Sequence, residues 1–282
     1  MEKRNYGVRG NTGLTLNVIE WGPPDAQPIV MLHGIRGYAE TFANLAGALA
    51  PAYRTIAYDQ RGRAGSDWDP KRQYFVESYL DDLDAVVAQL GLESFDLLGH
   101  SLGGMVSIVY AARRPQQVKR LVLEDAGPGA SNDSAGGERI RRELTTTPMT
   151  FRTWDAAVDF MRRLRPTVTA AAIEDRLHHM MKQSEGGWTW RYDHVGIAEA
   201  RLSTDPRNAV DLWPHVEKIA CPTLLLRGGR SDYLQRETAA AMSARNANIR
   251  WTDVPDAGHY IHDDQPAAFV SLVIDFLGCR LE

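Results

Sequence analysis

Residues 94–104 have the sequence SFDLLGHSLGG, which is the clearest indication of the fold in this chain. A mostly apolar run, FDLL, stops at Gly99, and a run with helical character begins just after Gly104. Ser101 stands at the corner between them, in the pattern Gly99-x-Ser101-x-Gly103. A sharp turn of this kind, from a strand into a helix, holds a serine oxygen out at the end of a sheet, and glycines flank the serine because side chains there would collide with backbone. The spacing therefore predicts a nucleophilic serine at Ser101.

Length and composition indicate an ordinary globular protein. The chain has 282 residues, of which 44% are hydrophobic and 24% charged, which suits one large domain or a domain with an insertion. The net charge of −4 favours neither nucleic acid nor an anionic membrane surface as a partner. The first residues lead into no apolar signal segment and no apolar run could cross a bilayer, so we expect a cytoplasmic protein. Cys221 and Cys279 make neither a disulfide framework nor a metal cluster, and we expect both to be reduced.

Short apolar runs alternate with helical patterns at both ends of the chain. Such runs, when they end in glycine or acidic loops, are typical of strands buried on both faces of a parallel sheet. We expect strands at 14–21, 28–34, 53–58, 95–98, 118–123, 223–228 and 249–254, and helices at 39–49, 79–90, 105–112, 238–242 and 269–277. The alternation predicts an α/β fold with a mainly parallel, doubly wound sheet that is covered by helices on both faces.

The rhythm changes between residues 129 and 212, where no buried-strand pattern appears. Helical patterns run through 140–144, 156–164 and 170–181. We interpret 129–212 as a helical lid inserted into a core that is formed by residues 1–128 and 213–282. Ligands of parallel α/β sheets bind at the carboxyl ends of the strands, so a lid inserted there would cover the site.

A nucleophilic serine needs a base to take its proton and an acid to orient that base. His259 follows the last predicted strand, in the loop DAGHY, and this position places it at the same sheet edge as Ser101. Asp232 and Asp125 each follow a predicted strand, and Asp232 gives the chain order Ser, Asp, His that accompanies this type of turn. We predict His259 as the base and Asp232 as the acid. Asp125 is the alternative acid, and otherwise caps the entry to the lid.

Two backbone N–H groups are expected to hold an oxyanion near Ser101. One belongs to Leu102, at the start of the following helix, and the other most plausibly to Ile35, in the glycine-containing loop after a buried strand. Arg36 lies beside that loop and is placed to meet a substrate carboxylate, although such an arginine more often pairs with a local acid.

Four aromatic or imidazole side chains complete the predicted substrate contacts: His100, Trp188, Trp190 and Tyr260. Aromatic residues and methionines of the lid suit a roomy apolar pocket and a bulky, partly apolar small molecule. We expect most of these lid residues to form the lid's own small core, and only one or two of them to line the pocket.

Together these motifs resemble the α/β-hydrolase superfamily over residues 1–128 and 213–282. The resemblance rests on His33-Gly34, the segment 59–66 (DQRGRAGS), the segment 99–104 (GHSLGG), Asp232 and Gly258-His259. It implies a serine hydrolase without cofactor or metal, in which Ser101 is the nucleophile, His259 the base and Asp232 the acid. Some relatives place the acid after the strand that follows the serine turn, which matches Asp125.

The expected activity is hydrolysis of a carboxylic ester or a lactone through an acyl-enzyme. The alternatives are hydrolysis of a carbon–carbon bond in a keto-acid, or of an amide, and, least expected, a non-catalytic ligand-binding protein. We expect a monomer or a homodimer.

Overall fold

The computed structural model describes residues 3–166 and 168–278, so Cys279 lies outside the described residues. Within them, one sheet has eight strands in the order β1-β2-β4-β3-β5-β6-β10-β11. The strands are β1 (Lys3–Arg9), β2 (Thr15–Trp21), β3 (Gln27–Leu32), β4 (Tyr53–Tyr58), β5 (Phe95–His100), β6 (Val118–Glu124), β10 (Thr223–Gly228) and β11 (Ile249–Val254). The pairs β1–β2 and β2–β4 are antiparallel, and the strands from β4 to β11 pair in parallel. The prediction of a mainly parallel α/β sheet is therefore confirmed.

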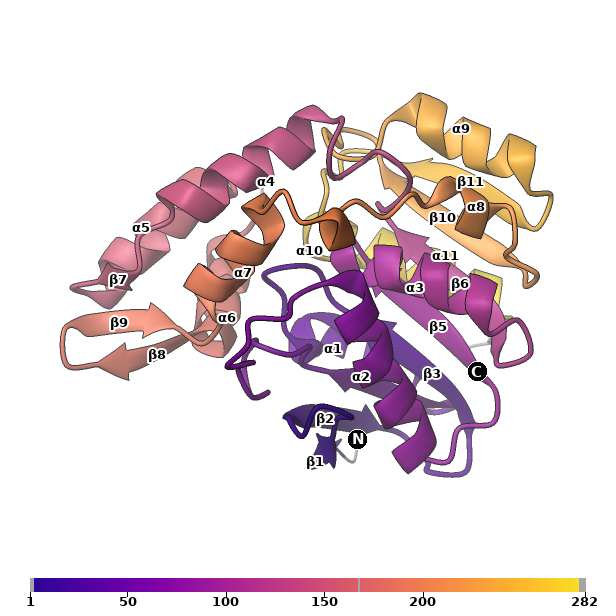
Figure 1. The fold of residues 1–282 in the computed structure, drawn as a ribbon, viewed down its shortest axis with the longest axis horizontal. Coiled ribbons are helices and arrows are strands. Elements are labelled where there is room, and N and C mark those ends of the chain that lie inside the picture. Colours follow the sequence, from indigo (N-terminus) through magenta and orange to yellow (C-terminus); the bar gives the residue numbers. More distant parts are fainter. Residues whose placement is uncertain (1–2, 167, 279–282) are drawn as a thin grey trace.

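Helices cover both faces of this sheet (Figure 1). They are η1 (Ala39–Phe42), α1 (Ala43–Leu49), α2 (Val76–Gln89), α3 (Leu102–Arg113), α8 (Trp213–Val216), α9 (Arg236–Arg245), α10 (Ile261–Asp264) and α11 (Pro266–Leu277). Successive side chains of a strand point to opposite faces, so Val30 and Leu32 join the core under α2 and α3, whereas Ile29 and Met31 join the core under α1 and α11. Burial on both faces explains why the strands appear in the sequence as continuous apolar runs.

The segment between β6 and β10 projects beside the sheet, at the left of Figure 1. Its helices are α4 (Ala135–Thr146), α5 (Trp154–Leu164), α6 (Ala170–Met180), α7 (His194–Leu202) and η2 (Pro206–Asn208). The N-cap side chains of Ser134, Thr153, Thr169 and Asp193 each accept a backbone N–H of the helix they begin, which satisfies a donor that the first turn leaves free. None of the described helices has the length and apolar character needed to cross a membrane.

This segment also contains a small antiparallel sheet that the sequence did not predict. Its strands are β7 (Thr150–Phe151), β8 (Met181–Ser184) and β9 (Gly187–Trp190), in the order β7-β9-β8. Strands of two to four residues are too short to show an alternating pattern. The division into a core and a lid remains a prediction, and we call residues 129–212 the insert below.

Candidate active site

The carboxyl ends of four neighbouring strands, β5, β6, β10 and β11, assemble the site. Ser101 links β5 to α3 with φ 53° and ψ −114°, a backbone conformation that non-glycine residues seldom adopt. A Cβ on Gly99 would lie 2.4 Å from the Gly103 carbonyl oxygen, and a Cβ on Gly103 would lie 2.2 Å from the Leu32 carbonyl oxygen. The turn therefore requires both glycines, and it holds Ser101 at the edge of the sheet.

Ser101, His259 and Asp125 form one continuous hydrogen-bonded chain. His259, in the loop after β11, places Nε2 3.0 Å from Ser101 Oγ and Nδ1 2.8 Å from Asp125 Oδ2. The His259 and Asp125 side chains are 2% and 0% exposed, so solvent does not compete for these bonds. Asp125 has φ 47°, a second strained position in the same site.

The prediction that Asp232 bonds His259 is wrong, and so is the prediction that Asp125 only caps the entry to the insert. The Asp232 carboxylate is 40% exposed and binds the Arg139 guanidinium of α4 through two hydrogen bonds, of 2.8 and 2.9 Å. Asp125 follows β6 directly, and β6 lies between β5 and β10 in the sheet. Its carboxylate therefore emerges between Ser101 and the loops that follow β10 and β11.

The last residue of β10 and the loop after it supply hydrogen-bond donors to Asp125. Gly228 N–H donates to Asp125 Oδ1 at 3.0 Å, and Ser231 Oγ–H donates to Asp125 Oδ2 at 2.5 Å. Burial raises the pKa of Asp125, and these two donors oppose that rise because they stabilise the carboxylate. Burial, followed by the charges of Arg139 and Arg165, lowers the pKa of His259 well below its usual range. A neutral imidazole is the form that can accept a proton from a serine.

The two residues predicted to hold an oxyanion, Leu102 and Ile35, both lie beside Ser101. Leu102 begins α3, so its N–H belongs to the first turn of a helix, where it is free of intrahelical bonds and at the positive end of the dipole. Ile35 follows Gly34, where a Cβ would lie 2.8 Å from His100 Nδ1 and 3.3 Å from Ser101 Cβ. Ile35, Ser101 and Leu102 line one small cavity of about 40 Å³.

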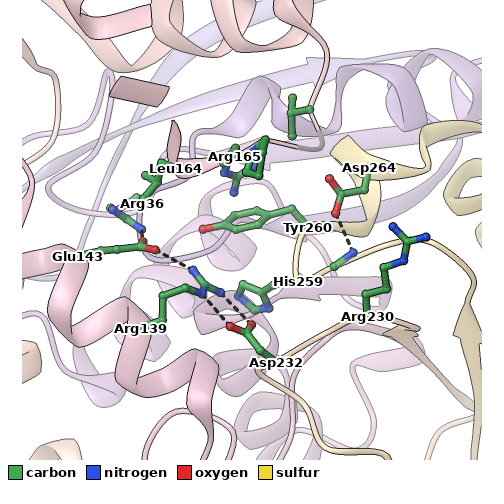
Figure 2. A pocket seen from close by; sticks show the side chains of 13 residues that line it. Arg36, Arg139, Glu143, Leu164, Arg165, Arg230, Asp232, His259, Tyr260 and Asp264 are labelled. Carbon is green, nitrogen blue, oxygen red and sulfur yellow. Dashed lines mark hydrogen bonds and ion pairs between the residues drawn. The ribbon is translucent and has the colours of Figure 1, made fainter. Parts of the chain in front are cut away.

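A larger cavity, of about 360 Å³, lies against His259 (Figure 2). Arg36, Arg139, Arg165 and Arg230 line it, together with acids and Tyr260. The insert contributes to both cavities, because α4 supplies Arg139 to this one and Ile140 to the one at Ser101.

Of the predicted substrate contacts, Arg36 and Tyr260 line the larger cavity. Arg36 is also paired with Glu143 of α4, which is the alternative that the sequence left open. His100 lies beneath the site instead: it is 2% exposed, and its Nε2 is 3.0 Å from the His259 carbonyl oxygen. It therefore supports the His259 loop from below.

The two tryptophans of β9 belong to the core of the insert. Trp188 packs edge-on against Trp154 of α5, with ring centroids 4.6 Å apart. Trp190 packs against Phe151, and its Nε1–H donates to the Pro148 carbonyl oxygen at 2.8 Å. Among the described residues, neither tryptophan lines these two cavities, but Trp190 lines a third, small cavity of about 20 Å³ together with Arg36 and Tyr260. That the two tryptophans contact the substrate therefore stays a prediction.

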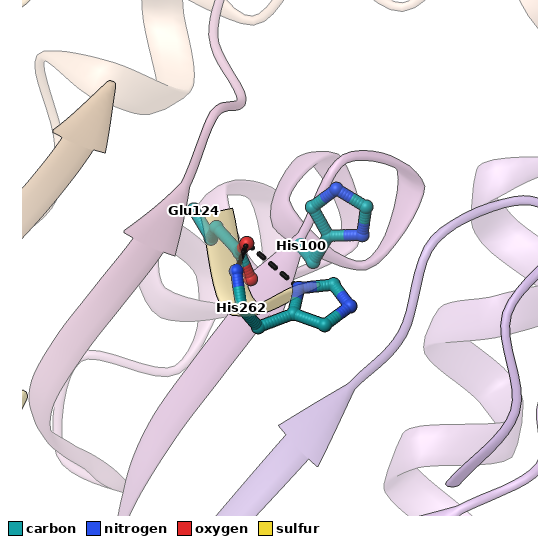
Figure 3. A group of neighbouring side chains, drawn as sticks. All are labelled: His100, Glu124 and His262. Atoms are coloured by element: carbon teal, nitrogen blue, oxygen red, sulfur yellow. Dashed lines mark hydrogen bonds and ion pairs between the residues drawn. The ribbon is translucent and has the colours of Figure 1, made fainter. Parts of the chain in front are cut away.

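A second buried histidine–carboxylate pair lies beside the first (Figure 3). Glu124 Oε1 accepts both the His262 backbone N–H at 2.9 Å and His262 Nδ1–H at 2.7 Å. Consecutive carboxylates, Glu124 and Asp125, thus hold two histidines three positions apart in one segment. His100, Glu124 and His262 have ligand atoms within 4.8 Å of one another, and by residue type they suit a metal ion. Glu124 and His262 are, however, already bonded to each other, and His262 Nε2 lies 2.9 Å from Thr41 Oγ1.

Sequence reasoning missed several residues that shape the site. Arg139 and Glu143 lie one helical turn apart on α4 and form an i,i+4 pair at 2.9 Å, a spacing that was available as a signal. Arg165, Ser231 and Glu124 carry no comparable local pattern. Their roles depend on partners more than 90 residues away in the chain.

Comparison with known proteins identifies the family of this chain. The sequence model of the alpha/beta hydrolase fold matches residues 27–266. A 3-hydroxybutyrate-oligomer hydrolase of Cupriavidus necator is 31% identical over 252 residues, which cover 85% of this chain and 85% of that protein. An sn-1-specific diacylglycerol lipase of Mus musculus is 30% identical over 270 residues, which cover 94% of this chain and 85% of that protein.

Among solved structures, E-2-(acetamidomethylene)succinate hydrolase matches with a TM-score of 0.87 at 25% identity, covering 99% of this chain and 100% of that one. These two relatives by sequence are hydrolases, and the family model covers most of this chain. The chain therefore belongs to the α/β hydrolase family.

Proposed function

We propose that this protein is a serine hydrolase that cleaves a carboxylic ester or lactone of a small molecule through an acyl-enzyme on Ser101. The observation that carries the proposal is the buried chain of hydrogen bonds from Ser101 Oγ to His259 Nε2, at 3.0 Å, and from His259 Nδ1 to Asp125, at 2.8 Å. A nucleophile, a base and an orienting acid in this order are what acyl transfer requires. The relatives that are a lipase and an oligomer hydrolase support an ester substrate.

In the first step, Ser101 Oγ attacks the carbonyl carbon while His259 Nε2 takes the hydroxyl proton. Asp125 accepts the Nδ1–H bond, which fixes the tautomer, and its negative charge stabilises the imidazolium that forms. The Leu102 and Ile35 N–H groups hold the negative charge that develops on the carbonyl oxygen. His259 then passes its proton to the leaving alcohol, and the acyl group stays on Ser101.

In the second step, His259 removes a proton from a water molecule that attacks the acyl-enzyme. The tetrahedral intermediate forms at the same place, so the same two N–H groups hold its oxygen. His259 returns the proton to Ser101 Oγ, and the carboxylic acid leaves. The low pKa of His259 keeps the imidazole neutral at the start of each step.

The test is a covalent one. A fluorophosphonate probe should label the wild-type protein on Ser101, as read by peptide mass spectrometry, and should not label Ser101→Ala. The Ser101→Ala variant should lose about 10⁶-fold in turnover of p-nitrophenyl butyrate, the scale of loss when a triad nucleophile is removed.

Ser107→Ala is the matched control, because Ser107 is buried in the same helix and its hydroxyl donates to the Gly103 carbonyl oxygen at 2.7 Å. It should keep both labelling and turnover. Turnover that survives in Ser101→Ala, or labelling elsewhere, would refute the acyl-enzyme.

A further inference from the structure

Several buried arginines surround the larger cavity beside His259, and pairs of them bind the same carboxylate. Arg165 and Arg176 both donate to the same oxygen of Asp263, at 2.7 and 2.8 Å. Their side chains are 8% and 5% exposed, so neither is compensated by bulk water. Two guanidinium charges therefore depend on one carboxylate oxygen in a desolvated place.

A second pair of arginines shares a second acid in the same way. Arg36 and Arg139 both bind Glu143, which is 8% exposed, and Arg139 also binds Asp232 through two hydrogen bonds. The remaining acid of the cavity wall, Asp264, accepts the Gly258 backbone N–H at 2.8 Å. The acids that face the cavity are thus already engaged.

Arg165 has an unused donor at this place. Among the described residues, its Nη2 is buried without a hydrogen-bond partner, and so is Nε of Arg176. Arg165 lines the cavity. Both guanidinium groups pack over the Tyr260 ring, that of Arg165 at 3.1 Å from the ring centroid and that of Arg176 at 5.3 Å. A buried charged donor with no partner is costly to the folded state, so its presence needs an explanation.

The pKa of the Tyr260 hydroxyl is affected by the same excess of positive charge. Its side chain points into the cavity between Arg36 and Arg165 (Figure 2). Burial alone would raise the pKa of Tyr260, but the charges of Arg165, Arg36 and Arg176 outweigh it and lower that pKa to about 8. Burial and the neighbouring Arg176 also lower the pKa of Arg165.

We propose that this cavity binds a carboxylate of the substrate, with the guanidinium of Arg165 as its main partner and Arg36 and the Tyr260 hydroxyl beside it. The substrate class is then an ester that carries a free carboxylate away from the scissile bond, such as the half-ester of a dicarboxylic acid or the acyl ester of a hydroxy acid. The planar fork of a guanidinium matches a carboxylate, and the anion would complete the charge balance. This proposal rests on the proposed function, because it places the carboxylate beside the proposed base.

Two matched pairs of esters test it by their kcat/KM values. Monoethyl succinate is compared with ethyl 4-methylpentanoate, in which an isopropyl group replaces the carboxylate. In the second pair, 3-acetoxybutyrate carries its carboxylate in the alcohol part of the ester. It is compared with 4-methylpentan-2-yl acetate, in which an isopropyl group again replaces the carboxylate. We expect the charged member of at least one pair to be hydrolysed with kcat/KM higher by about 10- to 100-fold, the worth of a charge-assisted hydrogen bond. A ratio near one in both pairs would overturn the proposal.

Variants connect that ratio to Arg165. Arg165→Met should bring it close to one, and Arg165→Lys, which keeps the charge for Asp263 but not the fork, should give an intermediate ratio. Arg230→Met is the matched control, because Arg230 stands on the rim of the same cavity, is 65% exposed and is paired with Asp256. It should leave the ratio unchanged. An equal fall in Arg230→Met and Arg165→Met would contradict a specific role for Arg165.

A binding measurement keeps this test separate from the test of the acyl-enzyme. Succinate, but not succinamide, should raise the melting temperature of the Ser101→Ala protein, and Arg165→Met should abolish the rise. If the acyl-enzyme is wrong, turnover will not depend on Ser101 although succinate still binds. If the carboxylate site is wrong, succinate will not bind although turnover depends on Ser101.

Discussion

The loops after β6 and after β10 each present an aspartate at the same edge of the sheet, yet the two residues have different environments. Asp125 is fully buried and accepts hydrogen bonds from Gly228, Ser231 and His259. Asp232 is 40% exposed and bound to Arg139. The strand that an aspartate follows and the donors around it therefore decide whether it meets His259, and its place in the chain order is a weaker guide.

Contacts with the insert explain the orientation of Asp232. Its carbonyl oxygen accepts the Gly136 N–H at 2.8 Å, at the start of α4, and its carboxylate binds Arg139 one turn further along that helix. Both contacts turn Asp232 toward the insert. Its neighbour Ser231 is turned the other way, toward Asp125. One loop thus attaches the insert on one side and supports the proposed acid on the other.

The largest expected effect comes from Asp125→Asn. The amide would present an NH₂ group or a neutral oxygen to His259, so the tautomer and the imidazolium would both lose their support, and kcat should fall by about 10⁴-fold. Asp232→Asn is the matched change in the other loop and should cost less than about 10-fold, because Asp232 does not contact the ring. Steady-state kinetics on p-nitrophenyl butyrate decide between them, and the reverse ranking would make Asp232 the acid.

Glu124→Gln should act on stability. Glu124 is fully buried and binds both the ring and the backbone N–H of His262. Burial alone would lower the pKa of His262, but the charge of Glu124 opposes this effect, and the pKa is raised. Loss of one partner of a buried pair costs about 3 kcal/mol, which chemical denaturation would measure. The pKa of His262 is higher in the folded protein than in the unfolded chain. The pair therefore contributes fully to the free energy of unfolding below the unfolded-state pKa, and this contribution is lost as the pH rises through the folded-state pKa. The difference between wild type and Glu124→Gln should therefore shrink at alkaline pH, and a difference that grows there would contradict this assignment.

Ser231→Ala removes one donor from the proposed acid while it leaves the carboxylate in place. A buried hydrogen bond to a charged group is worth about 1.5–3 kcal/mol, so we expect turnover to fall by about 10-fold and stability by a similar free energy. The acid would also become easier to protonate, since Ser231 holds the pKa of Asp125 down. Ser243→Ala, a serine of α9 that bonds a backbone carbonyl oxygen at 2.7 Å, serves as the control and should leave turnover unchanged.

The smallest expected effect is a shift in the pH profile. Burial, Arg139 and Arg165 lower the pKa of His259, whereas Asp232 raises it. His259 must be neutral to act as a base, so Arg139→Met should move the acid limb of kcat/KM to higher pH. Asp232→Asn should move it to lower pH, each by less than about one pH unit. Shifts in the same direction would show that the two side chains act on folding and not on the charge of His259.

Most of the sheet was predictable because its strands are buried on both faces. The continuous apolar runs mark β3, β5, β6 and β10 directly. β1, KRNYGVR, was not predicted, because an edge strand with one exposed face carries too few apolar residues to stand out. The short strands of the insert escaped prediction for a similar reason, since they are two to four residues long.

Residues close together in the chain are enough to predict the serine turn and the histidine loop. The serine turn requires Gly99 and Gly103, and these two glycines point to Ser101. A glycine-containing loop after the last strand points to His259. Each of these predictions depends on residues only a few positions away. The contact of His259 with Asp125 instead of Asp232, and the position of the arginines around one cavity, become visible in the folded chain alone. These arrangements depend on the order of strands in the sheet and on ion pairs across the insert, such as Arg139 with Asp232, whose members lie 93 positions apart. Short-range patterns carry no information about which long-range partner a charged side chain will find.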